Sequence, residues 1–137
     1  MDSKGHLNAF MRSSRGLGKI YYSCSKDDIH EKWSTPAPTK FENPNSGIDT
    51  VFFNGRLFLV YNPNVESRMP LVVSEIESEL FEVIDTVTIK ESIAEEELKK
   101  TSLTAELSYP YMTEHDGKLH CTYTHGRTKI EYVEIEI

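Results

Sequence analysis

Three arginines and a tyrosine have the chemistry to recognise an acidic ligand. The planar guanidinium of arginine matches a carboxylate with two parallel hydrogen bonds. Arg12 and Arg127 each follow a strand-like segment, Arg68 follows an Asn-Pro pair, and Tyr109 lies in a Ser-Tyr-Pro sequence. Surface arginines are commonly solvated, and tyrosines of this kind are commonly buried. The residue types alone therefore leave open both a carboxylate site and an ordinary surface.

The histidines and cysteines do not suggest a metal centre. His115, His120 and His125 recur every five residues, a spacing that suits neither one helix face nor one strand face. Cys24 and Cys121 are the only two cysteines, and neither belongs to a CxxC pair. We therefore expect no metal, no cofactor and two reduced, buried thiols.

Length and composition indicate one folded, soluble domain over residues 1–137. Hydrophobic residues make up 38% of the chain, which is too much for a disordered protein. The formal net charge of -7 would repel a phosphate backbone or an anionic membrane surface. We expect neither nucleic acid nor a membrane as partner, and a site for an anionic sugar would need arginines held locally.

The N-terminal residues 1–15 contain no apolar run of signal-peptide length, and no stretch of the chain approaches the length of a membrane helix. The localisation is unknown. As written, the chain is expected in the cytoplasm unless a leader precedes it.

An internal repeat organises the chain. Three copies of a glycine turn followed by a strand occupy residues 5–12, 54–61 and 116–123. Asn-Gly and Asp-Gly are typical of two-residue hairpin turns, which predicts preceding strands at residues 50–53 and 111–114. The spacing of the glycines is in the range of β-propeller blades, which take roughly 40 to 50 residues before loop insertions are added. Each blade is one four-stranded sheet.

Further strands are expected after these hairpins. Residues 19–25 and 70–74 follow the first two copies, and residues 129–137 follow the third as an edge or closing strand. Residues 90–100 are rich in Glu and Lys and have apolar residues at nearly helical spacing. They are interpreted as a loop insertion with one or two helical turns.

Two polar turns resemble the Asp-box of sialidases, Ser-x-Asp-x-Gly-x-Thr-Trp. Residues 25–33 keep the serine, Asp27 and Trp33, with Ile29 in the glycine position and one extra residue before the tryptophan. Residues 74–81 keep the serine and the aromatic residue but lose the aspartate. In such a turn the polar side chains satisfy backbone donors, so the role is architectural.

The resemblance extends over nearly the whole chain. Five elements follow in the order found in sialidase (neuraminidase)-like BNR-repeat proteins, namely residues 5–12, 25–33, 61–68, 74–81 and 108–110. This similarity implies an all-β fold, a partial β-propeller of sialidase type. The chain would form about three four-stranded blades of a six-bladed ring.

The resemblance also implies roles for single residues. Arg12 and Arg68 correspond to the second and third arginines of a clamp on the sialic acid carboxylate, and Tyr109 corresponds to the nucleophile. A neutral tyrosine avoids repulsion by the substrate carboxylate. Arg127 is a further candidate for the same face. Glu106 is expected to be structural, because residues three apart in a strand point to opposite faces.

The first arginine, the glutamate that activates the tyrosine and the aspartate acid/base of the family would precede residue 1. The resemblance therefore implies the C-terminal portion of an exo-α-sialidase-type glycoside hydrolase, with little or no activity as this chain alone. A non-catalytic carbohydrate-binding or scaffold propeller, or a partial propeller without a ligand, are the alternatives. The implied partners are sialic acid or another acidic glycan, and either a second copy or an upstream segment that completes the ring.

Overall fold

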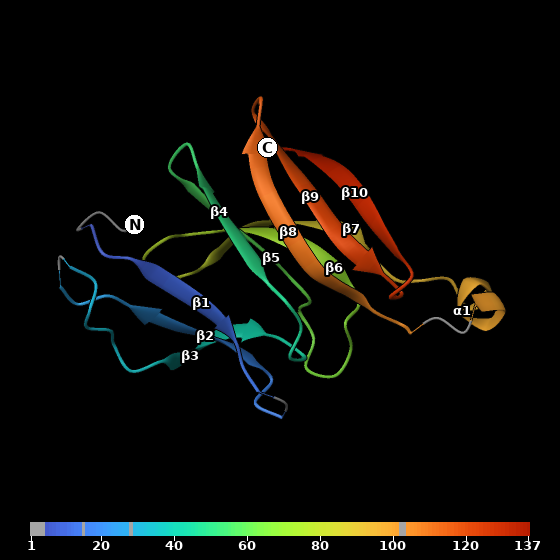
Figure 1. The fold of residues 1–137 in the computed structure, drawn as a ribbon. Helices are drawn as coiled ribbons and strands as arrows, with labels where there is room; N and C mark the ends of the chain where they lie inside the picture. Colours follow the sequence, from blue (N-terminus) through green and yellow to red (C-terminus); the bar gives the residue numbers. More distant parts are fainter. Residues whose placement is uncertain (1–4, 15, 28, 102–103) are drawn as a thin grey trace.

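The computed structural model describes residues 5–14, 16–27, 29–101 and 104–137 (Figure 1). These residues form an all-β fold with one short helix, and every pair of neighbouring strands is antiparallel. The elements are β1 (Asn8–Arg12), β2 (Lys19–Cys24), β3 (Ala37–Glu42), β4 (Asp49–Phe53), β5 (Arg56–Tyr61), β6 (Leu71–Ile76), β7 (Val83–Lys90), α1 (Glu95–Thr101), β8 (Leu107–His115), β9 (Lys118–His125) and β10 (Lys129–Glu136).

The strands form three separate sheets in chain order. The N-terminal sheet has the order β1-β2-β3, the central sheet β4-β5-β6-β7 and the C-terminal sheet β8-β9-β10. Three sheets of four strands were expected. Among the described residues only the central sheet has four, the other two have three, and the sheets form no closed ring.

The glycine hairpins are confirmed. Asn54 and Gly55 have φ angles of 49° and 77°, and Asp116 and Gly117 have 50° and 76°. Two successive residues with positive φ match the twist of the flanking strands, which is why Asn-Gly and Asp-Gly occur there. The prediction that residues 129–137 form an edge strand is confirmed by β10, and the helical turns expected in residues 90–100 correspond to α1.

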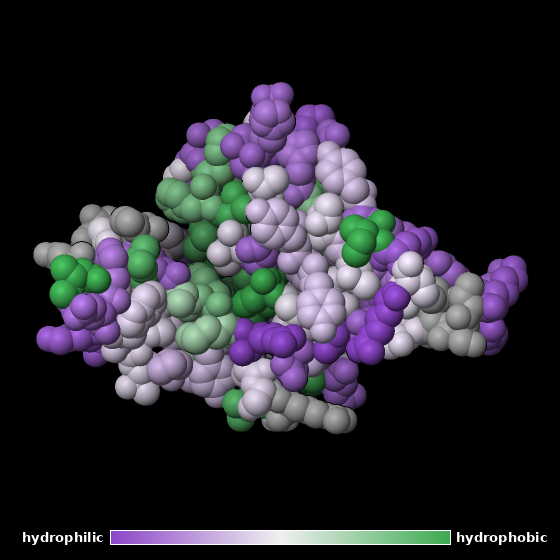
Figure 2. Space-filling view, viewed as in Figure 1, coloured by the Kyte–Doolittle hydropathy of each residue, from purple (hydrophilic) through white to green (hydrophobic). Residues whose placement is uncertain are grey.

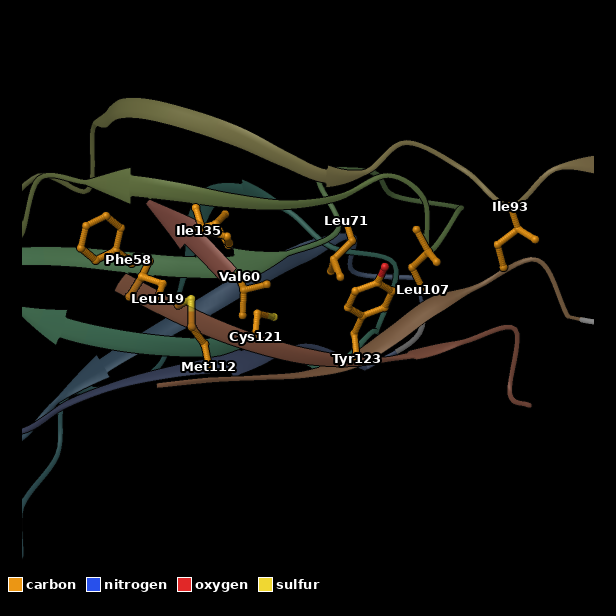
Figure 3. Packing of buried hydrophobic residues seen from close by; sticks show 11 residues of the cluster. Phe58, Val60, Leu71, Ile93, Leu107, Met112, Leu119, Cys121, Tyr123 and Ile135 are labelled. Carbon is orange, nitrogen blue, oxygen red and sulfur yellow. The ribbon is translucent and has the colours of Figure 1, made fainter. Parts of the chain in front are cut away.

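The side chains of β5 alternate between the two faces of the central sheet and are buried on both. Phe58 and Val60 pack toward the C-terminal sheet, and Leu59 and Tyr61 pack toward the N-terminal sheet. Figure 3 shows side chains of the first cluster pointing toward one another between the sheets. The central sheet is therefore the layer on which the other two pack.

Polar side chains cover most of the face seen in Figure 2, and apolar residues gather near its centre. No helix in the described part of the chain is long and apolar enough to cross a membrane.

Both cysteines are free. Cys121 is buried as predicted, whereas Cys24 is only half-buried, so that part of the prediction was wrong.

Candidate functional site

The three candidate arginines follow the same strand of each repeat. Arg12 is the last residue of β1, Arg68 lies in the connection after β5 and Arg127 lies in the turn after β9 (Figure 1). Each of these strands begins after its glycine turn, so each arginine lies at the end of its sheet opposite to that turn. The repeat thus places the three arginines at equivalent ends of three consecutive sheets.

A buried carboxylate joins two of these arginines. Glu106, whose side chain is 4% exposed, accepts a hydrogen bond of 2.9 Å from Nη2 of Arg127, and Nε of Arg127 is 2.9 Å from its other oxygen. Nη1 of Arg68 is 3.4 Å from both carboxylate oxygens, and the Ser108 hydroxyl donates to Oε1 at 2.8 Å. Glu106 therefore fixes the positions of both guanidinium groups.

The protonation of Glu106 follows from these contacts. Burial alone would raise its pKa, but hydrogen bonds from Arg127 and Ser108 and the charge of Arg68 outweigh burial and hold the pKa below its usual value. The carboxylate is therefore anionic at neutral pH, and two arginines share one negative charge.

Tyr109 lies beside Arg68 on the surface. Its φ angle of 51° interrupts the regular pairing at the start of β8, where the register with β9 shifts between Ser108 and Tyr111. The side chain is 57% exposed, and the guanidinium carbon of Arg68 is 5.9 Å from the ring centroid. The ordinary alternative of a buried tyrosine is therefore excluded.

Cross-sheet hydrogen bonds hold the Arg68 loop against β8. The buried amide of Asn62 donates to the carbonyl oxygens of Arg68, Pro70 and Leu107. The amide of Leu107 donates back to the Arg68 carbonyl at 3.0 Å. Nη2 of Arg68 donates to the Asn45 carbonyl at 3.3 Å. The position of Arg68 is thus set by segments from both the central and the C-terminal sheets.

The turn that carries Arg127 rests on a buried histidine. Nε2 of His125 is 3.0 Å from Glu97 of α1, and Nδ1 is 3.3 Å from Glu131 of β10. Burial would raise the pKa of Glu131, but hydrogen bonds from Tyr123, Lys129 and Lys90 lower it to about 2. Because the His125 carbonyl accepts the amide of Thr128, this network supports the turn.

Arg12 lies outside the hydrogen-bond network of Glu106 among the described residues. It is exposed and pairs with Ile20 in the register of β1 and β2. Within the described residues, no hydrogen bond or ion pair connects Arg12 to Glu106, Arg68 or Tyr109. The structure therefore brings Arg68, Arg127 and Tyr109 together and leaves Arg12 in the N-terminal sheet.

The polar turns lie at the other end of the sheets and are architectural. Asp27 accepts the amides of Glu31 and Lys32 at 2.9 and 3.3 Å, as expected for an Asp-box. In the second turn, Glu77 accepts the amides of Glu79 and Leu80. A glutamate thus performs the capping that the missing aspartate would perform.

A family model described as a BNR repeat-like domain matches residues 1–121 of this chain. The chain belongs to the BNR repeat-like family. This family is found in sialidase-like propellers, and the match includes Arg12, Arg68 and Tyr109 and ends before Arg127. No curated protein matches the chain.

The sequence reasoning missed the central position of Glu106 in this BNR repeat-like protein. Regular alternation was assumed between Glu106 and Tyr109, but Glu106 precedes β8 and pairs with Arg68 in an isolated bridge. The positive φ of Tyr109 then breaks the alternation. A buried-charge argument could have found Glu106, since a glutamate between Ala105 and Leu107 needs a cationic partner if the segment is buried.

Proposed function

We propose that the chain contributes the arginine and tyrosine side of a sialidase-like carbohydrate site. In this proposal the three sheets are blades of a six-bladed propeller of sialidase type. The order of strands in the central sheet and the equivalent positions of the three arginines support the assignment. The site lies where the connections after β5 and β9 meet the start of β8.

The observation that carries the proposal is the pair Arg68 and Arg127, fixed on Glu106 beside the exposed Tyr109. Two guanidinium groups against one buried carboxylate leave one positive charge. A guanidinium has five N–H donors, and those not used by Glu106 and Asn45 remain for a ligand. The cluster therefore suits a sugar with one carboxylate, and sialic acid is the proposed ligand class, with other acidic glycans as related ligands.

The proposed hydrolytic role assigns Tyr109 as nucleophile and Arg68 as carboxylate ligand. Arg127 joins them as a further carboxylate ligand, and Arg12 would extend the clamp from the N-terminal sheet. We expect little or no hydrolysis by the chain alone. Glu106 is anionic but is engaged by both arginines, so it is poorly placed to act as a base toward Tyr109.

A non-catalytic carbohydrate-binding propeller is the second candidate. The observation that favours it concerns the Tyr109 hydroxyl, which makes no hydrogen bond to any carboxylate among the described residues. A tyrosine nucleophile needs an adjacent general base. Binding without hydrolysis would follow from the same arginines.

Sialic acid binding and cleavage of a fluorogenic sialoside by the purified chain test this proposal. Arg68→Ala should weaken sialic acid binding about 10- to 100-fold, because a charge-assisted hydrogen bond contributes about 1.5–3 kcal/mol. Tyr109→Phe should retain binding and abolish any turnover. Arg56→Ala is the matched control, since Arg56 forms an ion pair with Glu75 on the central sheet and should bind like the wild type.

The outcomes separate the candidates. Turnover that Tyr109→Phe abolishes supports the hydrolase, and binding without turnover supports the binding module. Absence of sialic acid and uronic acid binding, or equal loss in Arg56→Ala and Arg68→Ala, would overturn the proposed site.

A further inference from the structure

The repeat defines equivalent positions on the three sheets. The fifth residue after each turn glycine is Phe10 in β1, Val60 in β5 and Thr122 in β9. The cross-strand neighbours of these positions in the following strand are Tyr22, Val73 and Tyr132. In the first two sheets this pair lies on the face directed toward the following sheet, and in the C-terminal sheet it lies on the face directed away from the central sheet.

The next sheet covers this pair at both junctions within the chain. Phe81, in the turn between β6 and β7, packs on Phe10 and Tyr22 with ring centroids 5.0 and 4.7 Å apart. Val60 and Val73 belong to the cluster between the central and C-terminal sheets. Coverage by the following sheet is thus a property of the repeat.

The third pair is uncovered among the described residues. Tyr132 is 57% exposed and its neighbour Ile130 is exposed as well. The Tyr132 hydroxyl is 2.6 Å from Nδ1 of His120 and 3.1 Å from Glu134, and the His120 and Tyr132 rings stack at 6.0 Å. These contacts hold the ring in one position, so the surface is preformed.

The matching half of this contact is uncovered at the other end of the chain. Trp33 is the aromatic residue of the first Asp-box, equivalent to Phe81 in the second, and it is 41% exposed. Its indole nitrogen donates to the His30 carbonyl at 3.0 Å, which attaches the ring to its own turn. By the repeat, Trp33 should pack on an aromatic pair of another sheet, as Phe81 packs on Phe10 and Tyr22.

We propose that a second copy of this chain covers both exposed aromatic surfaces. Trp33 of each copy packs on Tyr132 of the other, and two identical junctions continue the contact made by Phe81 and Tyr22 within the chain. Two such junctions are closed by a two-fold axis. The inference rests on the blade assignment of the proposed function and is independent of the sugar site.

The oligomeric state over a range of concentrations tests this proposal. Sedimentation or light scattering should give twice the mass of the 15.7 kDa chain. Trp33 is the only tryptophan, so its emission should shift to longer wavelength as the dimer dissociates on dilution. Trp33→Ala and Tyr132→Ala should each weaken dimerisation at least about tenfold, as expected for a central aromatic of an interface.

Two controls make the pairing specific. Phe52→Ala removes an equally exposed aromatic residue from β4 and should leave the mass unchanged. An equal mixture of Trp33→Ala and Tyr132→Ala chains should dimerise more strongly than either variant alone, because the mixed dimer contains one intact Trp33–Tyr132 pair. Circular dichroism should show that each variant remains folded.

A monomeric mass of the wild type at all concentrations would overturn the proposal and indicate that another chain or segment covers Tyr132. A dimer unaffected by both substitutions, or a mixture no stronger than the separate variants, would overturn the proposed pairing. Sialic acid titration of the same samples separates this result from the proposed function. A monomer that still binds sialic acid would overturn the dimer and leave the proposed sugar site intact. A dimer that does not bind sialic acid would overturn the sugar site and leave the dimer intact.

Discussion

Among single residues, Glu106 connects the stability of the fold to its proposed chemistry. A carboxylate with a side chain only 4% exposed is costly unless it is paired and hydrogen-bonded, and Arg68, Arg127 and Ser108 provide those contacts. The same contacts keep the two arginines at the surface in fixed positions. The position of both arginines, and hence a clamp made from them, therefore depends on one acidic residue.

Glu106→Gln should lower the free energy of unfolding by about 1–3 kcal/mol at pH 7, because it leaves a half-buried Arg68 without its counter-charge. The folded state lowers the pKa of Glu106, so its stabilising contribution is present above the ordinary value of 4.5 and is lost as the pH falls through the lowered pKa. The difference between wild type and variant should therefore shrink as the pH falls below 4.5 toward the lowered pKa of Glu106. Thermal unfolding between pH 3 and pH 7 measures it. Glu96→Gln on α1 is the exposed control, and a pH-independent difference would contradict this assignment of charge.

Among the elements, those with local signals were predictable. The glycine hairpins follow from backbone preferences of Asn-Gly and Asp-Gly, and the capped turns follow from their side-chain acceptors. Strands β3 and β7 were not predicted. Pro36 directly precedes β3, and Pro38 is its second residue. Most of β7 is exposed. Neither strand therefore has a clear alternating pattern of apolar and polar residues. Such outer strands are defined by pairing with a neighbour.

The site shows the same limit. The order of the motifs was sufficient to predict Arg68 and Tyr109 as site residues. Their proximity in the structure is consistent with that prediction. The link between Arg68 and Arg127 was not predictable, because it needs Glu106 at an isolated bridge between two sheets. The grouping of Arg12 with the others remains a prediction.

Gly47 tests how precisely the elements position Tyr109. A Cβ atom at Gly47 would lie 3.2 Å from Cα and 3.5 Å from N of Tyr109, so Gly47→Ala should displace the irregular start of β8 by a few tenths of an ångström. We expect about tenfold weaker sialic acid binding, since small displacements of positioned groups have large effects.

Gly55→Ala is the control. Its φ of 77° is unfavourable for alanine, with nothing within 4 Å, so it should lose about 1–2 kcal/mol of stability and keep binding. Unchanged binding in Gly47→Ala would contradict the positioning role.

At the scale of the whole molecule, the central sheet couples the two hydrophobic clusters. Residues of β5 and β6 contribute to both clusters, so neither outer sheet has a core of its own. A single cooperative unfolding transition is the expected consequence. The alternative is that an outer sheet opens at lower free energy than the rest.

Thiol labelling distinguishes these cases, because Cys121 lies in the cluster between the central and C-terminal sheets. Burial, with the nearby charge of Asp49, raises the pKa of Cys121 to about 12, so a thiol reagent should react only after the sheet opens. In a Cys24→Ser variant, the free energy of opening obtained from Cys121 labelling should equal that from denaturant unfolding followed by circular dichroism. Labelling at a clearly lower free energy would mean that the C-terminal sheet detaches on its own. The half-buried Cys24 in a Cys121→Ser variant should react faster, because its thiol at the end of β2 is already partly accessible.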